Sequence, residues 1–454
     1  MQYARAGMHI YAPRFPRGRP APPDPTRPVS EPMTAPRPLL LAYSGGLDTS
    51  FLVAWLSRER GFAVHALTVD CGGFQAAERA EIVARAEAFG ARSHRFVDAR
   101  QALYGEVLRW LVIGHVRRGG TYPLCVAAER GLQARALARL AREQGFAAVA
   151  HGCTGAGNDQ IRFEAALALH GRGLEVHAPI REQSFSRQDA LAYLAAQGFP
   201  WPASRARYSV NEGLWGVSIG GAETLTSEQA LPEEAWLWTR ADRRSAGRRI
   251  VELGFESGEA VAIDGERLGP VELIERLNDL GGRYGVGRGY HLGDTLLGFK
   301  GRIGYEAPAA EILIQAHREL EKLVLTQDQR SVKDSLAELY GQRLHQGLGF
   351  EPALRDIEAL WASSQARVEG RVRVELDSGR ALVIGLDSPH SMLARQGAVY
   401  GERPAAGQSS AGAEWLARTL AEPARLWHLA GESTPPAPVP GASPAHPVAV
   451  LKEA

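Results

Sequence analysis

One stretch near the N-terminus, residues 39–50, constrains the fold more than any other part of the chain. The apolar run at 39–42 is typical of a buried parallel strand, and it leads directly into Ser44-Gly45-Gly46. Asp48 then opens a helical pattern with apolar residues on one face. Glycines let the backbone approach an anion closely, and the free N–H groups of a helix start point at it. Strand, glycine turn and helix start in this order predict a phosphate-binding loop.

The donors of this loop are hydroxyl groups, because no lysine follows the glycines as it would in a Walker motif. Ser44, Thr49 and Ser50 can donate hydrogen bonds to a phosphate without adding charge. The loop resembles the pyrophosphate-binding loop of ATP pyrophosphatases, which cleave ATP between its α and β phosphates. The alternative is a serine-rich turn that binds nothing, because short motifs also occur by chance.

Between residue 38 and about 200, short apolar runs alternate with helical patterns, which is typical of an α/β fold. We expect a Rossmann-like, doubly wound parallel sheet, with Ser186 and Asp189 as a capping box on one of its helices. A second glycine-rich loop, 152–157, follows an expected strand. Ligands bind beyond the carboxyl ends of such strands, so the two glycine loops should face one cleft. Further strands are expected at 63–69, 94–97, 146–150 and 174–178, and helices at 101–116 and 124–144.

The composition changes near 200–202, and the pattern beyond it predicts an α+β domain with no phosphate loop of its own. Two hairpins are expected, at 249–264 and 372–384. Helices are expected at 270–280, 308–324, 331–346, 351–366 and 411–430. The resulting division is a Pro/Arg-rich disordered extension (1–37), a nucleotide-binding domain (38–203), an α+β synthetase and oligomerisation domain (204–408), a C-terminal helix (409–430) and a disordered tail (431–454). We favour Met33 as the true first residue of the protein.

Charge and cysteine usage exclude several classes of protein. Lys plus Arg is 52 and Asp plus Glu is 51, so the net charge of +1 predicts neither a nucleic-acid nor a membrane surface. Cys71, Cys125 and Cys153 are far apart, which argues against a zinc ribbon, a disulfide framework or a redox dithiol. No apolar run approaches ~18–20 residues, and no secretory signal is evident. We expect a cytoplasmic soluble enzyme.

The second loop and its continuation, His151–Glu164, are long and unusual. Together with residues 42–50, in this order and at this distance, they resemble the argininosuccinate synthase family, and the resemblance extends over about 38–430. It implies an adenine nucleotide α-hydrolase-like fold and an arginine-biosynthetic ligase that joins aspartate to citrulline through citrullyl-AMP. It also implies ATP with Mg²⁺ as cofactors and a homotetramer whose C-terminal helix reaches a neighbouring subunit.

The resemblance assigns roles to residues, which we state as expectations. Asp48 and Asp159 would be catalytic, and Asp159 would meet the ammonium of aspartate and take a proton from it. Expected ATP contacts are Ala42, Tyr43, Ser44, Gly45, Gly46, Leu47, Asp48, Thr49, Ser50, Val69 and Gly152. Expected aspartate contacts are Thr154, Asn158 and Asp159. Expected citrulline contacts are Tyr122, Asn158, Arg162, Ser209, Ser218 and Tyr305. No protein side chain is expected to hold a metal. Singly, each of these residues could instead be an ordinary packing, turn or capping residue.

Several positions depart from the family pattern. Ala156 stands where the family usually has Lys, and Val126-Ala127 where it often has two hydroxyl residues. Gly131 replaces a proline, and Gly293 aligns with a Glu that contacts the citrulline amine. Losing a charge partner from a buried site can cost ~3–5 kcal/mol. Two readings stay open: Asp294 substitutes by a one-residue shift, or the acceptor is a different ureido or amide compound.

Other enzymes with a similar first loop fit less well. Glutamine-dependent amidotransferases need an amidase with a nucleophilic cysteine, and tRNA-thiolating enzymes need catalytic cysteines and a basic face. Neither feature is present in the sequence. A degenerate nucleotide-binding regulator remains as an alternative that is not an enzyme.

Overall fold

The computed structural model describes residues 36–199, 201 and 207–431. Its N-terminal part is built on a five-stranded sheet in the order β3-β2-β1-β4-β5, and every neighbouring pair is parallel. The predicted α/β class with a doubly wound parallel sheet is confirmed. The strands are β1 (Arg37–Ala42), β2 (Phe62–Asp70), β3 (Ser93–Asp98), β4 (Ala148–Ala150) and β5 (Glu175–His177).

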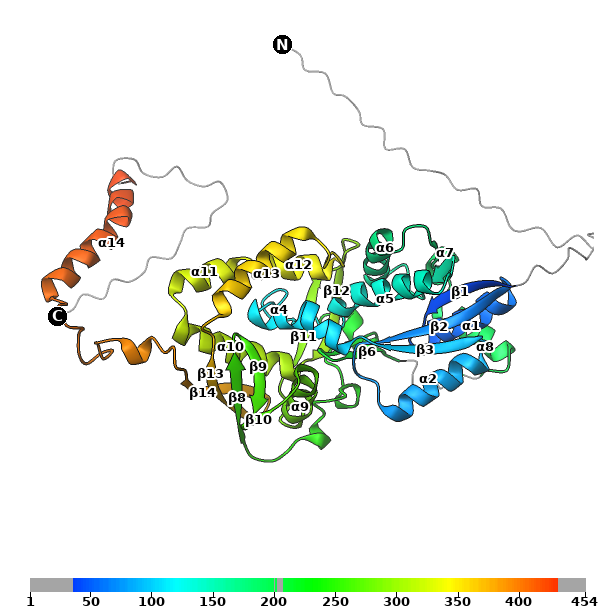
Figure 1. The fold of residues 1–454 in the computed structure, drawn as a ribbon, viewed down its shortest axis with the longest axis horizontal. Helices are drawn as coiled ribbons and strands as arrows, with labels where there is room; N and C mark the ends of the chain where they lie inside the picture. Colours follow the sequence, from blue (N-terminus) through cyan, green and yellow to red (C-terminus); the bar gives the residue numbers. More distant parts are fainter. Residues whose placement is uncertain (1–35, 200, 202–206, 432–454) are drawn as a thin grey trace, which may run out of the picture.

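Helices cover both faces of this sheet (Figure 1). The alternation of side chains along β1 divides the core, because Leu39 and Leu41 pack on one face and Leu40 on the other. The first face is covered by α1 (Leu47–Arg58), α2 (Ala76–Ala88) and α8 (Arg187–Ala196). The second face is covered by α5 (Arg130–Glu143) and α6 (Asp159–His170). The predicted capping box of Ser186 and Asp189 starts α8.

Three predicted helices differ from the observed ones. Residues 101–116 form α3 (Arg100–Leu103), a π-helical turn (Tyr104–Leu108) and α4 (Arg109–Ile113). The helix expected at 124–144 begins later, because Leu124 and Val126 have left-handed φ values of 63° and 64°. A short 3₁₀ turn (Ala127–Glu129) follows them and leads into α5. The helix expected at 331–346 is two helices, α11 (Gln327–Ser335) and α12 (Ala337–His345).

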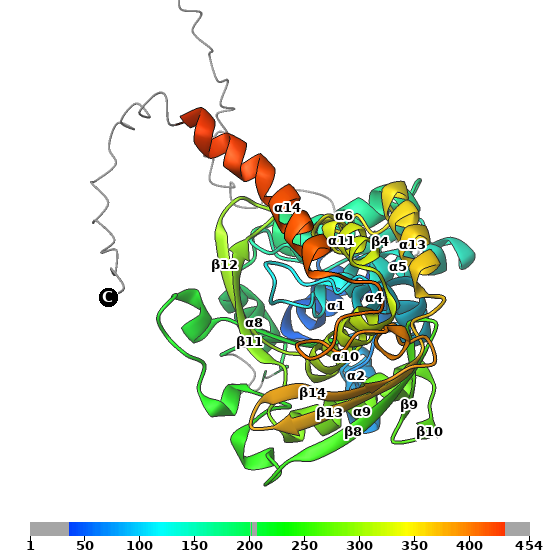
Figure 2. The ribbon, with the colours of Figure 1, turned by 90° about the vertical axis from the view of Figure 1, so that its left-hand side faces the viewer.

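The C-terminal part contains a five-stranded sheet in the order β10-β9-β8-β13-β14. Both predicted hairpins are present in it, with antiparallel pairing. Figure 2 shows β8, β13 and β14 side by side beneath α10 (Pro308–Val324). The strands are β8 (Arg249–Glu256), β9 (Glu259–Ile263), β10 (Glu266–Arg267), β13 (Gly370–Asp377) and β14 (Arg380–Asp387), and α9 (Pro270–Arg283) packs against β9.

A second antiparallel sheet, in the order β11-β12-β7-β6, was not predicted. It consists of β6 (Ser209–Gly213), β7 (Gly216–Gly220), β11 (Arg288–Asp294) and β12 (Lys300–Glu306). Each of the four strands contains glycine, which is depleted in strands and weakens the sequence signal from which strands are predicted.

The last described helices are α13 (Pro352–Gln365) and α14 (Ser410–Gly431). α14 stands apart from the body, and none of its residues is buried (Figures 1 and 2). Most of the extension and tail expected to be disordered, Met33 included, lies outside the described residues, although β1 begins at Arg37. None of the helices in the described ranges combines the length and apolar composition needed to span a bilayer.

Candidate active site

The two glycine-rich loops lie against each other. They leave the carboxyl ends of β1 and β4, which are neighbours in the parallel sheet. A Cβ atom at Gly152 would lie 3.0 Å from Cγ2 of Thr49, so the second loop contacts the start of α1. The predicted convergence of the loops is confirmed.

The first loop is shaped for close backbone approach. Gly45 has a left-handed φ of 75°, and its carbonyl accepts a 2.6 Å hydrogen bond from Arg85 Nη1. No side chain caps the start of α1, which leaves its first N–H groups available. The Ser44 hydroxyl lies 3.2 Å from that of Thr49. Burial raises the pKa of Asp48 in this first turn, and Arg187 partly offsets that rise.

Not every predicted ATP residue presents its side chain to a ligand. Tyr43, Leu47 and Ser50 are buried in the core beneath the loop. The Ser50 hydroxyl lies 3.2 Å from the Tyr43 hydroxyl, and Thr68 donates to the Tyr43 carbonyl at 2.7 Å. These residues support the loop from below. The exposed hydroxyl of the stretch belongs to Ser44.

The start of α6 carries a carboxylate between two guanidinium groups. Asp159 Oδ2 accepts from Arg130 Nε at 2.9 Å, and Oδ1 accepts from Arg162 Nη1 at 2.7 Å. Burial alone would raise the pKa of Asp159, but the two arginines outweigh it and lower the pKa to about 2. A carboxylate with this pKa is a weak base near neutral pH. The geometry therefore favours Asp159 as a permanent anion over the proton-accepting role that we expected.

Other parts of the chain hold these groups in place. Arg130 Nη2 donates to Asn211 Oδ1 of β6 at 2.9 Å, and Arg162 Nε donates to the His345 carbonyl at 2.8 Å. Asn158 Oδ1 accepts from the Leu296 N–H, in the turn between β11 and β12, at 2.8 Å. Of the predicted aspartate residues, Thr154 lies exposed on the second loop, close to α6.

The unpredicted sheet brings together the expected citrulline residues. Directly paired residues share a face of an antiparallel sheet, and Tyr305 pairs with Ser218, which pairs with Asn211. Ser209 lies two residues before Asn211 and therefore belongs to the same face. We call this surface the acceptor face; its residues are Ser209, Asn211, Gly213, Ser218, Gly289, His291, Gly293 and Tyr305.

Tyr122 covers part of the acceptor face. Its ring stacks on His291, with centroids 4.9 Å apart and planes at 21°, and lies 5.3 Å from the Tyr305 ring. The Tyr122 hydroxyl donates to the Cys125 carbonyl, and the Tyr305 hydroxyl donates to the Thr121 carbonyl at 3.2 Å. The loop at 117–124 is thereby fixed against the sheet.

Two family models match this chain: the arginosuccinate synthase N-terminal HUP domain at residues 38–200 and the arginosuccinate synthase C-terminal domain at 208–413. The chain belongs to the argininosuccinate synthase family. A similar protein named argininosuccinate synthase, from Methanocaldococcus jannaschii, is 38% identical over 364 residues, which are 80% of this chain and 92% of the relative. Another, from Xanthomonas campestris pv. campestris, is 40% identical over 371 residues, which are 80% and 92% of the two chains.

One reading of the departures from the argininosuccinate synthase pattern is wrong. Asp294 does not replace the carboxylate that is missing at Gly293, because neighbouring residues of a strand point to opposite faces. Asp294 is exposed and pairs with Lys300, Nζ to Oδ1, at 2.5 Å. A Cβ at Gly293 would lie 2.6 Å from His291 Nε2, so the imidazole occupies the space beside it.

Sequence reasoning missed three residues of this argininosuccinate synthase site. Arg130 holds Asp159, His291 stacks on Tyr122, and the Glu129 carboxyl is buried against Gly213. Glu129 and Arg130 lie two and three residues after Ala127, close to the positions that depart from the family pattern, and this proximity was the signal that could have identified them. His291 lies on a strand that sequence reasoning did not identify.

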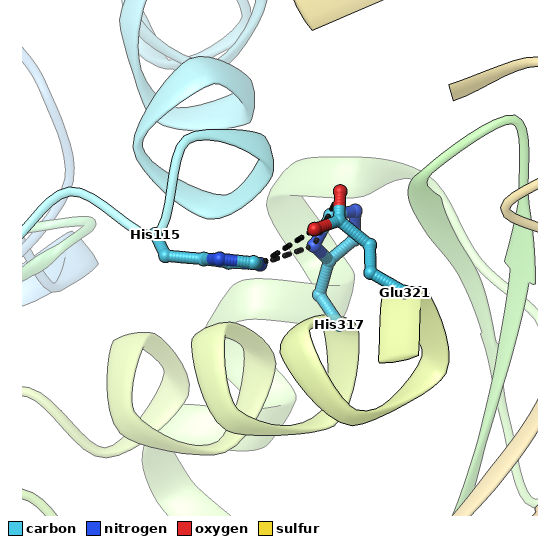
Figure 3. A group of neighbouring side chains, drawn as sticks. All are labelled: His115, His317 and Glu321. Atoms are coloured by element: carbon cyan, nitrogen blue, oxygen red, sulfur yellow. Dashed lines mark hydrogen bonds and ion pairs between the residues drawn. The ribbon is translucent and has the colours of Figure 1, made fainter. Parts of the chain in front are cut away.

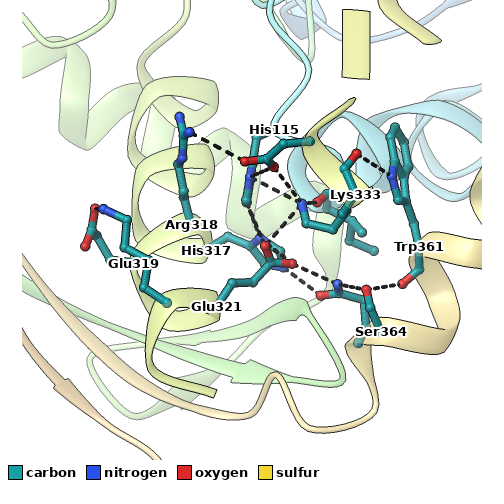
Figure 4. Close-up of polar contacts among 12 residues, drawn as sticks. His115, His317, Arg318, Glu319, Glu321, Lys333, Trp361 and Ser364 are labelled. Atoms are coloured by element: carbon teal, nitrogen blue, oxygen red, sulfur yellow. Dashed lines mark hydrogen bonds and ion pairs between the residues drawn. The ribbon is translucent and has the colours of Figure 1, made fainter. Parts of the chain in front are cut away.

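Within the described part of the chain, His115, His317 and Glu321 have the composition of a metal site (Figure 3). His115 Nε2 and His317 Nδ1 lie 2.9 Å apart. The ammonium of Lys333 occupies the same cluster, 3.1 Å from Glu321 Oε2 and 3.3 Å from His115 Nδ1 (Figure 4). Because that ammonium would repel a cation, we interpret the cluster as a polar network that ties α10 to α11 and to the end of α4.

Proposed function

We propose that this protein joins L-aspartate to L-citrulline with the conversion of ATP to AMP and pyrophosphate. The observation that supports this proposal best is the contact between the two glycine loops at the carboxyl ends of β1 and β4, with Asp159 and Arg162 following the second loop. A nucleotide held at the first loop would lie beside an amino acid held at the second. The relatives named argininosuccinate synthase support the same reaction.

The chemistry follows from the substrates. A ureido carbon is a poor electrophile without a good leaving group, so it needs activation. The ureido oxygen attacks the α-phosphorus of ATP and releases pyrophosphate. The aspartate amine then attacks the carbon of citrullyl-AMP, loses a proton and expels AMP to give argininosuccinate. Holding the reactants in register can supply effective molarities of up to about 10⁵–10⁸ M.

The predicted roles are part of this proposal. The 42–50 loop with Gly152, and Val69 at the end of β2, would bind ATP, which brings its Mg²⁺. Thr154, Asn158 and Asp159 would bind aspartate, with Asp159 as the fixed anion for its ammonium. The acceptor face would bind citrulline together with Tyr122, Asn158 and Arg162. Arg162 already donates from Nε to the His345 carbonyl and from Nη1 to Asp159, so its remaining N–H groups would meet the citrulline carboxylate.

The assembly and compartment are also proposals. Six large apolar residues of α14 are exposed: Trp415, Leu416, Leu420, Leu426, Trp427 and Leu429. Such a face needs a partner in water, which supports a homotetramer in which α14 packs on a neighbouring subunit. We propose the cytoplasm as the compartment, in line with the cysteine usage.

The test is pyrophosphate release by the full chain with ATP and Mg²⁺. We expect release only when citrulline and aspartate are both present, with the mass of argininosuccinate among the products. Pyrophosphate release with aspartate and another ureido compound, but not with citrulline, would identify that compound as the acceptor in place of citrulline. ATP binding without release for any acceptor would instead identify a regulator.

A further inference from the structure

Glu129 is a buried carboxyl group, and its Oε1 has no hydrogen-bonding partner among the residues that the structure describes. The residue is only 2% exposed, and its Oε1 atom is inaccessible to solvent. Burying a carboxyl without compensation costs free energy, and native proteins satisfy most such groups. An unpaired buried carboxyl next to a substrate site therefore suggests that a ligand supplies the missing hydrogen-bond donor.

The acceptor face leaves room for this carboxyl. A Cβ atom at Gly213 would overlap the Glu129 carboxyl, so the side chain fits because position 213 is glycine. Gly213 lies on the same face of β6 as Ser209 and Asn211. Arg130, the next residue in the chain, donates to Asn211. Glu129 thus stands over the end of the acceptor face, beside the arginine that holds Asp159.

The surroundings keep Glu129 protonated while no ligand is bound. Burial raises its pKa to about 8, Arg130 opposes that rise, and the negative charges of Asp159 and Asp70 add to it. Asp159 is itself committed to two arginines. A cation arriving at the carboxyl would offset the burial and favour the ionised form.

The other carboxylates around the acceptor face already have partners. Glu306 accepts from the N–H groups of Leu237, Trp238 and Thr239 and from the Thr239 hydroxyl. Glu212 accepts from Trp238 Nε1, Glu311 pairs with Arg117, and Asp294 pairs with Lys300. The acceptor face itself carries no acidic side chain.

We propose that Glu129 binds the α-ammonium of the acceptor and replaces the carboxylate that Gly293 lacks. This inference rests on the proposed function, because it takes citrulline as the acceptor. When the ammonium arrives, the Glu129 carboxyl releases its proton to solvent and forms an ion pair with it. Glu129 is then a residue that determines specificity in the citrulline site.

The test compares wild-type protein with Glu129→Gln, which keeps the shape and removes the charge. We expect the KM for citrulline to rise at least about tenfold, because charge-assisted hydrogen bonds are roughly twice as strong as neutral ones. The KM for ATP and for aspartate should stay within about twofold of wild type, since neither substrate would contact Glu129 directly. The thermal midpoint of the free protein should stay close to that of wild type, because a protonated carboxyl and an amide are both neutral polar groups of similar size. Asp294→Asn, on the outward face, is the matched control and should change none of these values.

Comparison with a second acceptor distinguishes loss of ammonium binding from a loss of activity that affects all acceptors. The citrulline analogue without the α-amino group should be a poor substrate for wild type, whereas Glu129→Gln should treat the two compounds nearly alike. An unchanged preference for citrulline in the variant overturns the inference. If Glu129→Gln lowers the thermal midpoint and reduces kcat/KM equally for every substrate, then Glu129 has a structural role. That result also overturns the inference.

The proposed function can fail separately. If wild type releases no pyrophosphate with citrulline and aspartate, calorimetric titration of both acceptors into the two proteins still decides the role of Glu129. Tighter binding of citrulline than of its analogue in wild type, lost in Glu129→Gln, supports the inference without turnover. Absence of citrulline binding to wild type overturns it.

Discussion

Arg130 Nε lies 2.9 Å from Asp159 Oδ2, and the same guanidinium reaches Asn211 Oδ1 at 2.9 Å. This arrangement joins the two sheets that form the site, because Asp159 starts α6 beside the parallel sheet and Asn211 lies on β6 of the acceptor face. The residues proposed to bind ligands in the two parts are therefore fixed relative to one another by a partly buried charge network.

Asp159→Asn should remove most of the activity. The change leaves Arg130 and Arg162 without their shared anion and removes the charge proposed to meet the aspartate ammonium. A hydrogen bond to a charged group contributes about 1.5–3 kcal/mol. We expect kcat/KM for aspartate to fall at least about tenfold, which corresponds to the lower end of that range. Steady-state kinetics measure this loss, with exposed Asp356→Asn as a control that keeps wild-type values.

The pH profile gives a second test of Asp159. Its pKa is lowered to about 2, so the carboxylate stays ionised throughout the neutral range. The loss of activity on acidification should therefore not follow the titration of this residue. An inflection of kcat/KM near pH 4, where the side chain of free aspartate titrates, should be the same in wild type and in Asp159→Asn. An inflection there in wild type that disappears in Asp159→Asn would contradict the ionised state described here.

Gly45→Ala should weaken ATP binding. The φ of Gly45 is 75°, and a Cβ would lie 2.8 Å from Cγ1 of Ile82, so the loop would have to move. We expect about 1–3 kcal/mol of strain and at least about a tenfold rise in the KM for ATP. Gly61→Ala is a matched control, because Gly61 has a φ of 65° but no atom within 4 Å of the added Cβ. That variant should lose some stability and keep its KM for ATP.

The sequence predicted the parallel sheet and its two loops because both depend on local patterns. Buried strands read as apolar runs, and glycines at their carboxyl ends mark close approach to a ligand. The acceptor face could not be predicted in this way, since its short strands are rich in glycine, including Gly213 and Gly293, and glycine is depleted in strands. The position of Asp294 depended on that missing strand, so the one-residue shift was plausible in sequence and wrong in structure. The place of Glu129 beside the acceptor face could not be recognised from the sequence, because it depends on the three-dimensional contact with Gly213.

The face of α14 should control assembly. Leu416, Leu420 and Trp427 share one side of the helix, and all three are exposed. Replacing Leu420 by Glu places a charge where the proposed tetramer would bury this side, so light scattering should detect smaller assemblies. Ala421→Glu puts the same charge near the opposite side and should leave the mass unchanged. Equal masses for the two variants would remove α14 from the interface.

The network of His115 and His317 should make the protein sensitive to acid. Burial lowers the pKa of both imidazoles to about 3, with Lys333 contributing, whereas an unfolded histidine titrates near 6.5. Between these values the unfolded chain binds protons that the folded chain does not, so the free energy of unfolding falls as the pH is lowered below about 6.5. Each histidine contributes about 1.4 kcal/mol per pH unit in this window.

His115→Gln tests this sensitivity, because the amide keeps a hydrogen-bonding group beside Lys333 and cannot titrate. Denaturant unfolding of wild type and variant at pH 7 and pH 5 should give a shallower pH dependence for the variant, by about 1.4 kcal/mol per pH unit at the acid end of the window. The expected difference comes from the burial of His115 beside Lys333. Exposed His390→Gln is therefore the control, and it should retain the wild-type slope. Equal slopes for all three proteins would mean that the buried imidazoles take up protons in the folded state, and that the pair of His115 and His317 is charged in acid.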